Sequence, residues 1–121
     1  MAAPNIVNVS SIYGRTVGAT LNLTNTQSYV VCPTDKVLKI NSILVSNTVS
    51  SVEEVTVNFY DSSLANFFTL ANGISIPPSS SLVILGKDSC IYLEEGDTIQ
   101  AGATSINALD IIISYEELDD A

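Results

Sequence analysis

The sequence predicts an all-β fold, a single domain built as a β-sandwich or jelly roll. Three observations carry this prediction. No stretch of the 121 residues keeps the apolar spacing of a helix, short β-branched runs recur, and polar turn residues separate them at regular intervals. No repeat, linker or change of composition marks a second domain, so residues 1–121 are expected to share one core.

The clearest strand is predicted over residues 54–61, where apolar and polar side chains alternate, so one face would be buried and the other wet. Residues 110–116 repeat this alternation, but Ile112 makes the second face partly apolar, and that face is expected to meet a neighbouring subunit. The remaining strands are predicted at residues 7–12, 19–24, 29–32, 37–46, 67–70, 74–76, 82–85, 91–93 and 98–103.

Turns are predicted where the residues favour them physically. Asn72-Gly73 can supply the two positive φ angles of a tight hairpin, and Pro77-Pro78 must end a ladder because neither residue donates a backbone hydrogen bond. Gly96 permits a left-handed conformation and Asp97 can accept hydrogen bonds from nearby backbone, which predicts a turn at Gly96 and Asp97.

The two ends of the chain are predicted to behave differently from the middle. Residues 1–25 have a weak apolar pattern, which favours an N-terminal arm or edge hairpin that packs on another subunit rather than completing its own core. Residues 116–121 are rich in acidic side chains, so an acidic, solvated tail is expected.

Charge excludes several classes of partner. The chain has 13 acidic and 4 basic residues, for a net charge of −9, so nucleic acid and acidic membranes are not expected to bind. No apolar run is long enough to span a bilayer, and the first residues do not resemble a secretory signal, which predicts synthesis in a cytosol. The negative charge favours solubility at high local concentration.

The sequence offers no catalytic constellation, so we expect no enzyme, no catalytic residues and no cofactor site. Histidine is absent, which removes the most frequent general base, and the paired acidic residues are neighbours that would point to opposite faces of a strand. The six glycines form no phosphate-binding loop.

Two sets of residues bear on metal binding, the cysteines and the acidic residues around Gly96. Cys32 and Cys90 lie far apart without a CxxC spacing, which favours reduced, buried thiols over a metal site or a disulfide. Calcium is an alternative at the acidic residues around the Gly96 turn, but their spacing is not that of a calcium loop, so a structural turn is favoured and no metal is predicted. The acidic residues concerned are Asp88, Glu94, Glu95 and Asp97.

Several segments resemble small virion-associated proteins of tailed bacteriophages, particularly marine and cyanobacterial phages. The resemblance covers about residues 36–118, and its motifs are residues 36–47, 55–61, 76–77, 82–85, 87–88, 91–97 and 114–117. It implies a virion structural protein but assigns no functional residues. The turn at Gly96 and Asp97 is also similar to jelly-roll trimers of the tumour-necrosis-factor group and its complement relatives, which makes a homotrimer the expected assembly.

The expected function is therefore that of a capsid decoration or cement protein, which stabilises the outer shell by contact with the phage major capsid protein. The outside is favoured because a DNA-filled interior would repel an acidic protein. The alternatives are a neck, tail or fibre component and, from another class, a receptor-binding or sugar-binding adhesion module. The expected location is the virion, assembled in the host cytoplasm, with Ile112 as the candidate self-interface.

Overall fold

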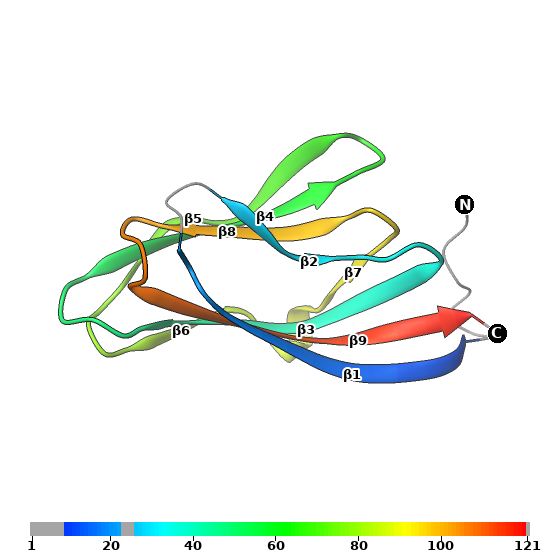
Figure 1. Ribbon diagram of the computed structural model, residues 1–121, viewed down its shortest axis with the longest axis horizontal. Helices are drawn as coiled ribbons and strands as arrows, with labels where there is room; N and C mark the ends of the chain where they lie inside the picture. The colour runs from blue at the N-terminus through cyan, green and yellow to red at the C-terminus, as the bar shows by residue number, and fades with distance from the viewer. Residues whose placement is uncertain (1–8, 23–25, 121) are drawn as a thin grey trace.

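The computed structural model describes residues 9–22 and 26–120, and it confirms the all-β prediction. Apart from a short 3₁₀ helix, η2 (Lys87–Ser89), the described elements are strands, arranged in two antiparallel sheets packed as a sandwich (Figure 1). The strands are β1 (Val9–Thr20), β2 (Gln27–Val31), β3 (Lys36–Asn47), β4 (Glu53–Asp61), β5 (Asn66–Ile76), β6 (Ser81–Leu85), β7 (Ile91–Leu93), β8 (Thr98–Ala103) and β9 (Leu109–Asp120).

The two sheets contain strands from all parts of the chain. The first sheet has the order β1-β9-β3-β6, with β7 also paired to β3, and the second sheet has the order β2-β8-β4-β5. The pairing is nested: β4 pairs with β5, β3 with β6 and β7, β2 with β8, and β1 with β9. The chain therefore crosses repeatedly between the sheets, and its loops gather at the two ends of the sandwich.

The core lies between the sheets and follows the alternation of apolar residues. Ile111 and Ile113 of β9 face Val55 and Val57 of β4 across the core, and all four side chains are fully buried. Burying each such side chain contributes about 1.5–3 kcal/mol, and a register slip of one residue would turn the whole set toward water. Alternation thus fixes both the faces and the register of the central strands.

The predicted hairpin at Asn72-Gly73 is wrong. The two short strands expected on either side of it are one strand, β5, and the residues around Gly73 form a bulge: Val55 pairs with Ile74, whereas Val57 pairs with Ala71. Gly73 has a φ of +60°, and its N–H donates to Thr56 Oγ1 over 3.1 Å. The glycine is used to accommodate an extra residue in a strand, while Pro77-Pro78 directly follows the strand as predicted.

The predicted N-terminal arm is also corrected for the described residues. The segments 7–12 and 19–24, predicted as separate strands, are largely replaced by β1, which pairs with β9 along its length, and Leu21 after it is fully buried. β1 therefore completes the chain's own first sheet, and it forms no edge hairpin because β2 belongs to the other sheet. Residues 1–8 and 23–25, which belong to the same prediction, lie outside the described residues.

The solvated acidic tail is wrong for residues 116–119, because β9 continues through them to Asp120. Their acidic side chains meet basic ones on the neighbouring strands. Arg15 Nε lies 3.3 Å from Glu117 Oε1, Lys36 Nζ 2.7 Å from Asp119 Oδ2, and Lys39 Nζ 3.8 Å from Glu116 Oε1.

Candidate functional site

The loops gather at the two ends of the sandwich (Figure 1), and the two ends differ in charge. The neutral end comprises the β3–β4, β5–β6 and β8–β9 loops, residues 47–52, 77–80 and 104–108, which contain no charged residue. The acidic end comprises the β2–β3, β4–β5 and β7–β8 loops, residues 32–35, 61–65 and 94–97, which contain five acidic residues and no basic one. Charge is therefore distributed along the long axis of the sandwich.

The predicted turn at Gly96 and Asp97 lies between β7 and β8 and ties the acidic end together. Asp97 is 6% exposed; its Oδ1 accepts the Ser62 N–H at 3.0 Å, and its Oδ2 accepts the Glu94 N–H at 3.0 Å. Its backbone carbonyl accepts the Cys32 N–H at 2.9 Å. Gly96 has a φ of +86°, and a Cβ there would lie 2.8 Å from Ser62 Oγ, so glycine is required on two counts.

The calcium alternative finds no support in this geometry. Asp88 lies in η2 before β7, whereas Glu94, Glu95 and Asp97 follow β7. The Asp97 carboxylate is already taken up by its hydrogen bonds, and Glu95 Oε2 accepts the Asp35 N–H at 3.2 Å. Within residues 9–22 and 26–120, no three Cys, Asp or Glu side chains are grouped so as to hold a metal ion.

The neutral end is organised by Asn47, which the sequence reasoning missed. Asn47 is 3% exposed, and its Nδ2 donates to Ser51 O at 2.8 Å and to Ile76 O at 3.0 Å, while its Oδ1 accepts the Val49 N–H at 3.0 Å. An asparagine at the end of an apolar strand and before Thr/Ser residues is a local signal for such a turn. The hydrogen bond from Asn47 to the Ile76 carbonyl could not be predicted from the local sequence.

Glu53 is a second buried polar group near the neutral end. Its carboxylate accepts hydrogen bonds from Ser51 Oγ at 2.9 Å and Thr104 Oγ1 at 3.1 Å. Hydrogen bonds from Ser105, Ser51 and Thr104 together hold the pKa of Glu53 below its usual value. The Glu53 carboxylate has a structural role, because its donors lie in the β3–β4 and β8–β9 loops and it links these two loops. The donors are Ser51, Thr104 and Ser105.

Ile112 lies on the outer face of the first sheet, as its place in the alternation predicted. It pairs with Gly18 of β1 and with Leu44 of β3, and Leu44 pairs with Val83 of β6. We call Gly18, Ile112, Leu44 and Val83 the apolar row; Ile112 is 38% and Val83 60% exposed. Because Gly18 has no side chain, a shallow hollow opens beside Ile112.

The apolar row is bordered by hydroxyl side chains across the same sheet. One neighbouring row consists of Thr16, Ser114 and Ser42, and the other of Thr20, Asp110, Ser46 and Ser81. Asp110 is the single charge among these positions, and it accepts a hydrogen bond from Thr20 Oγ1 at 2.7 Å. Around Ile112, a protein with a net charge of −9 thus presents a patch with an apolar centre and a single charge. The charged pair Lys39 and Glu116 lies farther along the sheet.

No protein-family model matches the sequence, and no curated protein matches it. In the described part of the chain, none of the helical structure is long and apolar enough to cross a membrane. Function must therefore be argued from the surfaces of the protein itself.

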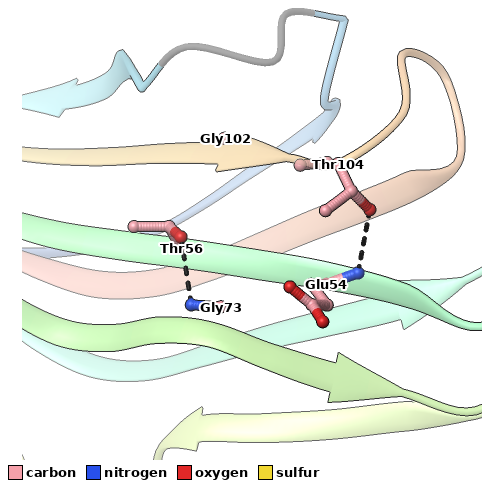
Figure 2. Close-up of a pocket in the computed structure, with 6 residues that line it drawn as sticks. Glu54, Thr56, Gly73, Gly102 and Thr104 are labelled. Carbon is pink, nitrogen blue, oxygen red and sulfur yellow. Dashed lines mark hydrogen bonds between the residues drawn. The ribbon is translucent and has the colours of Figure 1, made fainter.

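A polar pocket of about 190 Å³ lies on the second sheet (Figure 2). Gly102 and Gly73 leave the space, and Glu54, Thr56 and Thr104 border it. Thr56 Oγ1 accepts the Gly73 N–H and Thr104 Oγ1 accepts the Glu54 N–H, both at 3.1 Å. Both hydroxyl groups are therefore engaged in hydrogen bonds with the backbone. With one lining carboxylate and no partner base beside it, the pocket contains no acid–base pair or activated nucleophile.

A second hollow is apolar and lies where the β4–β5 hairpin and β7 face each other. We call it the edge cleft; it measures about 140 Å³ and is lined by Phe59, Phe68, Leu70, Ile91 and Tyr92. Phe68 and Tyr92 are 45% and 46% exposed, so large apolar rings remain in water here. The sequence placed these rings in strands but gave no sign that the sandwich opens beside them.

The two cysteines are both free, and they differ in environment. The Cys32 thiol is buried and donates to Lys36 O at 3.2 Å, whereas Cys90 is half-buried. Burial raises the pKa of Cys32 to about 11. A thiol held protonated in this way is a poor nucleophile, which makes Cys32 a packing residue.

Proposed function

We propose that the chain is a structural protein of a tailed-phage virion, a decoration or cement protein that packs on the outside of the capsid. The observation that carries the packing role is the apolar row around Ile112, whose neighbouring rows contain one charged residue, Asp110. The proposed location in a phage virion is based on the resemblance of residues 36–118 to virion-associated phage proteins. The proposed partners are copies of this chain and the major capsid protein.

We infer further that the sandwich is a jelly roll. The support is the nested pairing, with β4–β5 innermost and β1–β9 outermost, when β6 and β7 are counted as one interrupted strand. Jelly rolls of this kind occur in viral capsid and lectin domains, among others. Because jelly rolls occur in proteins with different functions, the fold supports the proposed function less strongly than the surface does.

The apolar row suits contact between copies because of the charge of the chain. Copies with a net charge of −9 repel each other, and at physiological salt this repulsion extends over about 8 Å. A contact centred on the apolar row buries hydrophobic surface where few charges oppose the approach. A closed ring of three copies is the assembly that we propose.

Replacing Ile112 by aspartate tests the packing role. Because Ile112 is partly exposed, we expect the domain to stay folded while self-association weakens at least about tenfold, which corresponds to about 1.4 kcal/mol. Val31→Asp is the matched control, since Val31 is an exposed apolar residue of the second sheet. Sedimentation velocity that shows the same assembly for wild type and Ile112→Asp contradicts the proposal.

Electron cryomicroscopy of intact virions tests the location. We expect density for this sandwich repeated over the outer capsid lattice. Density confined to a vertex, collar or tail would replace the decoration role by the neck, tail or fibre role, and absence from the particle would refute a virion protein.

The polar pocket favours a second candidate, a sugar-binding adhesion module. Its hydroxyls and the Glu54 carboxylate could bond a polar ligand, but no aromatic ring lines it to stack against a sugar. Binding of a glycan in an array, lost in Glu54→Ala and kept in Ile112→Asp, would establish this function instead.

A further inference from the structure

β5 is a long edge strand with one unpaired side. Among the strands that the structure describes, it pairs with β4 alone, and it runs for 11 residues at the border of the sandwich. Figure 1 shows the β4–β5 hairpin standing out from the rest of the sandwich toward its tip. A free strand edge presents backbone N–H and C=O groups that another strand can pair with.

The other sheet edges in the described residues carry the usual protections, and β5 has fewer. β2, β6 and β7 are five, five and three residues long, and β1 carries the charged Arg15. β5 contains no charged residue and no proline. Its protections are two bulges, at Leu70 and near Gly73, and the Asn66 side chain, whose Oδ1 accepts the Phe67 N–H at 2.9 Å. The bulges leave Asn66–Thr69 in regular register with β4.

Large apolar side chains of β5 are exposed on both faces of the sheet. Phe67 is 52% exposed and pairs with Tyr60 on the outer face, with ring centroids 4.9 Å apart. Phe68 is 45% exposed and packs on Phe59 in the edge cleft, with centroids 6.3 Å apart. Leu70, at 37% exposure, extends the same cleft, so the apolar surface continues around the free edge.

We infer that β5 is an interface strand that pairs with β5 of a second copy, antiparallel and about a twofold axis, to join two second sheets edge to edge. The partner must offer an extended, uncharged strand with apolar rings on both faces, and β5 itself fits that description. A twofold axis brings like faces together, so Phe67 meets apolar surface on one face and Phe68 on the other.

The absence of charged residues in β5 also favours a second copy as the partner. The acidic residues next to β5 are Glu53, Glu54 and Asp61 of β4, one strand behind the edge. At about 4.8 Å per strand the backbone of β4 would lie about 10 Å from the partner's β5, which is about one screening length. The Glu54 side chain leans toward Gly73 of β5, so the part of the edge with the least charge is residues 67–69. Like-charged copies can therefore pair here with little repulsion.

This contact is separate from the apolar row, which lies on the first sheet, and it goes beyond the proposed function. A chain with both contacts would form an assembly larger than either contact gives alone. The two inferences can therefore fail independently.

The test compares wild type, Phe67→Lys, Ile12→Lys and Ile112→Asp by sedimentation velocity across the micromolar range. Phe67→Lys should weaken self-association at least about tenfold. Ile12→Lys should not, although Ile12 is 61% exposed and also lies on an edge strand. Equal loss in both lysine variants, no loss in Phe67→Lys, or a wild type that stays monomeric overturns the inference.

Hydrogen exchange separates strand pairing from side-chain contact. In the wild type and in Ile112→Asp, the amides of residues 66–74 should exchange more slowly as protein concentration rises; in Phe67→Lys they should not. Protection that is independent of concentration, or that is lost in Ile112→Asp, overturns edge pairing. Protection that develops only with added capsid protein overturns the second copy as occupant. If Phe67→Lys unfolds, Thr69→Lys, at an exposed neighbouring position, carries the same test.

Discussion

Asn47 at the neutral end of the sandwich and Asp97 at the acidic end are both buried polar side chains, and they form hydrogen bonds in opposite directions. At the neutral end, Asn47 mainly donates, to the carbonyls of Ser51 and Ile76. At the acidic end, Asp97 only accepts, from Ser62 and from the Glu94 N–H. The backbone groups that surround each position therefore favour an amide at Asn47, beside two carbonyl oxygens, and a carboxylate at Asp97, beside N–H and O–H donors.

This difference has a consequence for the surface. The acidic end adds four further carboxylates around Asp97, while the neutral end exposes uncharged residues such as Val52 and Ile106, which are 58% and 59% exposed. Copies approaching one another through their acidic ends would meet strong repulsion. Substitutions of Asn47 and Asp97 test how far the two ends differ in the buried group that each requires.

The largest effect is expected from Asn47→Asp. The new carboxylate would face two carbonyl oxygens instead of donating to them, and a buried unpaired charge costs about 3–5 kcal/mol. Asn47→Ala, which removes the hydrogen bonds without adding charge, should cost about 1–3 kcal/mol. Urea unfolding measures both; an Asn47→Asp variant more stable than Asn47→Ala would contradict this account.

At the acidic end the order should reverse, because there the carboxylate is the required group. Asp97→Ala should lower the free energy of unfolding by about 2–3 kcal/mol, since three hydrogen bonds to a charged acceptor are lost. Asp97→Asn should cost less, because its amide oxygen can still accept the hydrogen bonds from Ser62. The loss that remains comes from its NH2 group, which cannot accept the Glu94 N–H. Wild-type stability in Asp97→Asn would show that charge is not needed at this end.

A smaller effect is expected at acid pH, with one contribution from each end. Hydrogen bonds from Ser105, Ser51 and Thr104 lower the pKa of Glu53, and hydrogen bonds from Ser63 and the Leu64 backbone lower the pKa of Asp61. Their stabilisation is present above the ordinary values of 4.5 and 3.8 and is lost as pH falls through the lowered ones.

NMR titration of the two carboxyl groups measures this. Ser63→Ala should raise the pKa of Asp61 toward its ordinary value and leave Glu53 unchanged, and Thr104→Val should do the converse. Each variant is the control for the other, and a common shift of both groups in either variant would argue against local hydrogen bonding as the cause.

The smallest effect concerns the thiols. At neutral pH, Cys90 should react with a thiol reagent before Cys32, which is buried with a raised pKa. Above pH 9 the unfolded state loses the Cys32 proton first, so stability should fall until the folded thiol ionises near pH 11. Cys32→Ala should remove that fall. Equal labelling of both cysteines in the folded protein would contradict the burial of Cys32.

The sequence predicted the central strands well because their signal is local. Alternation in β4 and β9 gave their faces and placed Ile112 outside. It failed at β1 and at residues 116–119, because these strands depend on each other across the chain, as in the pair Arg15 and Glu117. Asn72-Gly73 was misread because a positive φ serves a bulge as well as a hairpin.

The candidate surfaces were partly predictable for the same reason. Ile112 could be found, but the rest of its row required the register with Gly18, Leu44 and Val83. The role of Asn47 depends on the Ile76 carbonyl, 29 residues away, and backbone partners leave no trace in side-chain pattern. The free edge of β5 follows from strand order alone.

The pairing of β1 with β9 bears on how the chain folds during synthesis. Among the described strands β1 pairs only with β9, and its register runs to Asp120, so β1 cannot pair until β9 has been synthesised. The β4–β5 hairpin, by contrast, can close as soon as residue 76 emerges. Because such long-range pairing is slow, we expect β1 to remain unpaired and exposed until β9 has emerged and docked on it.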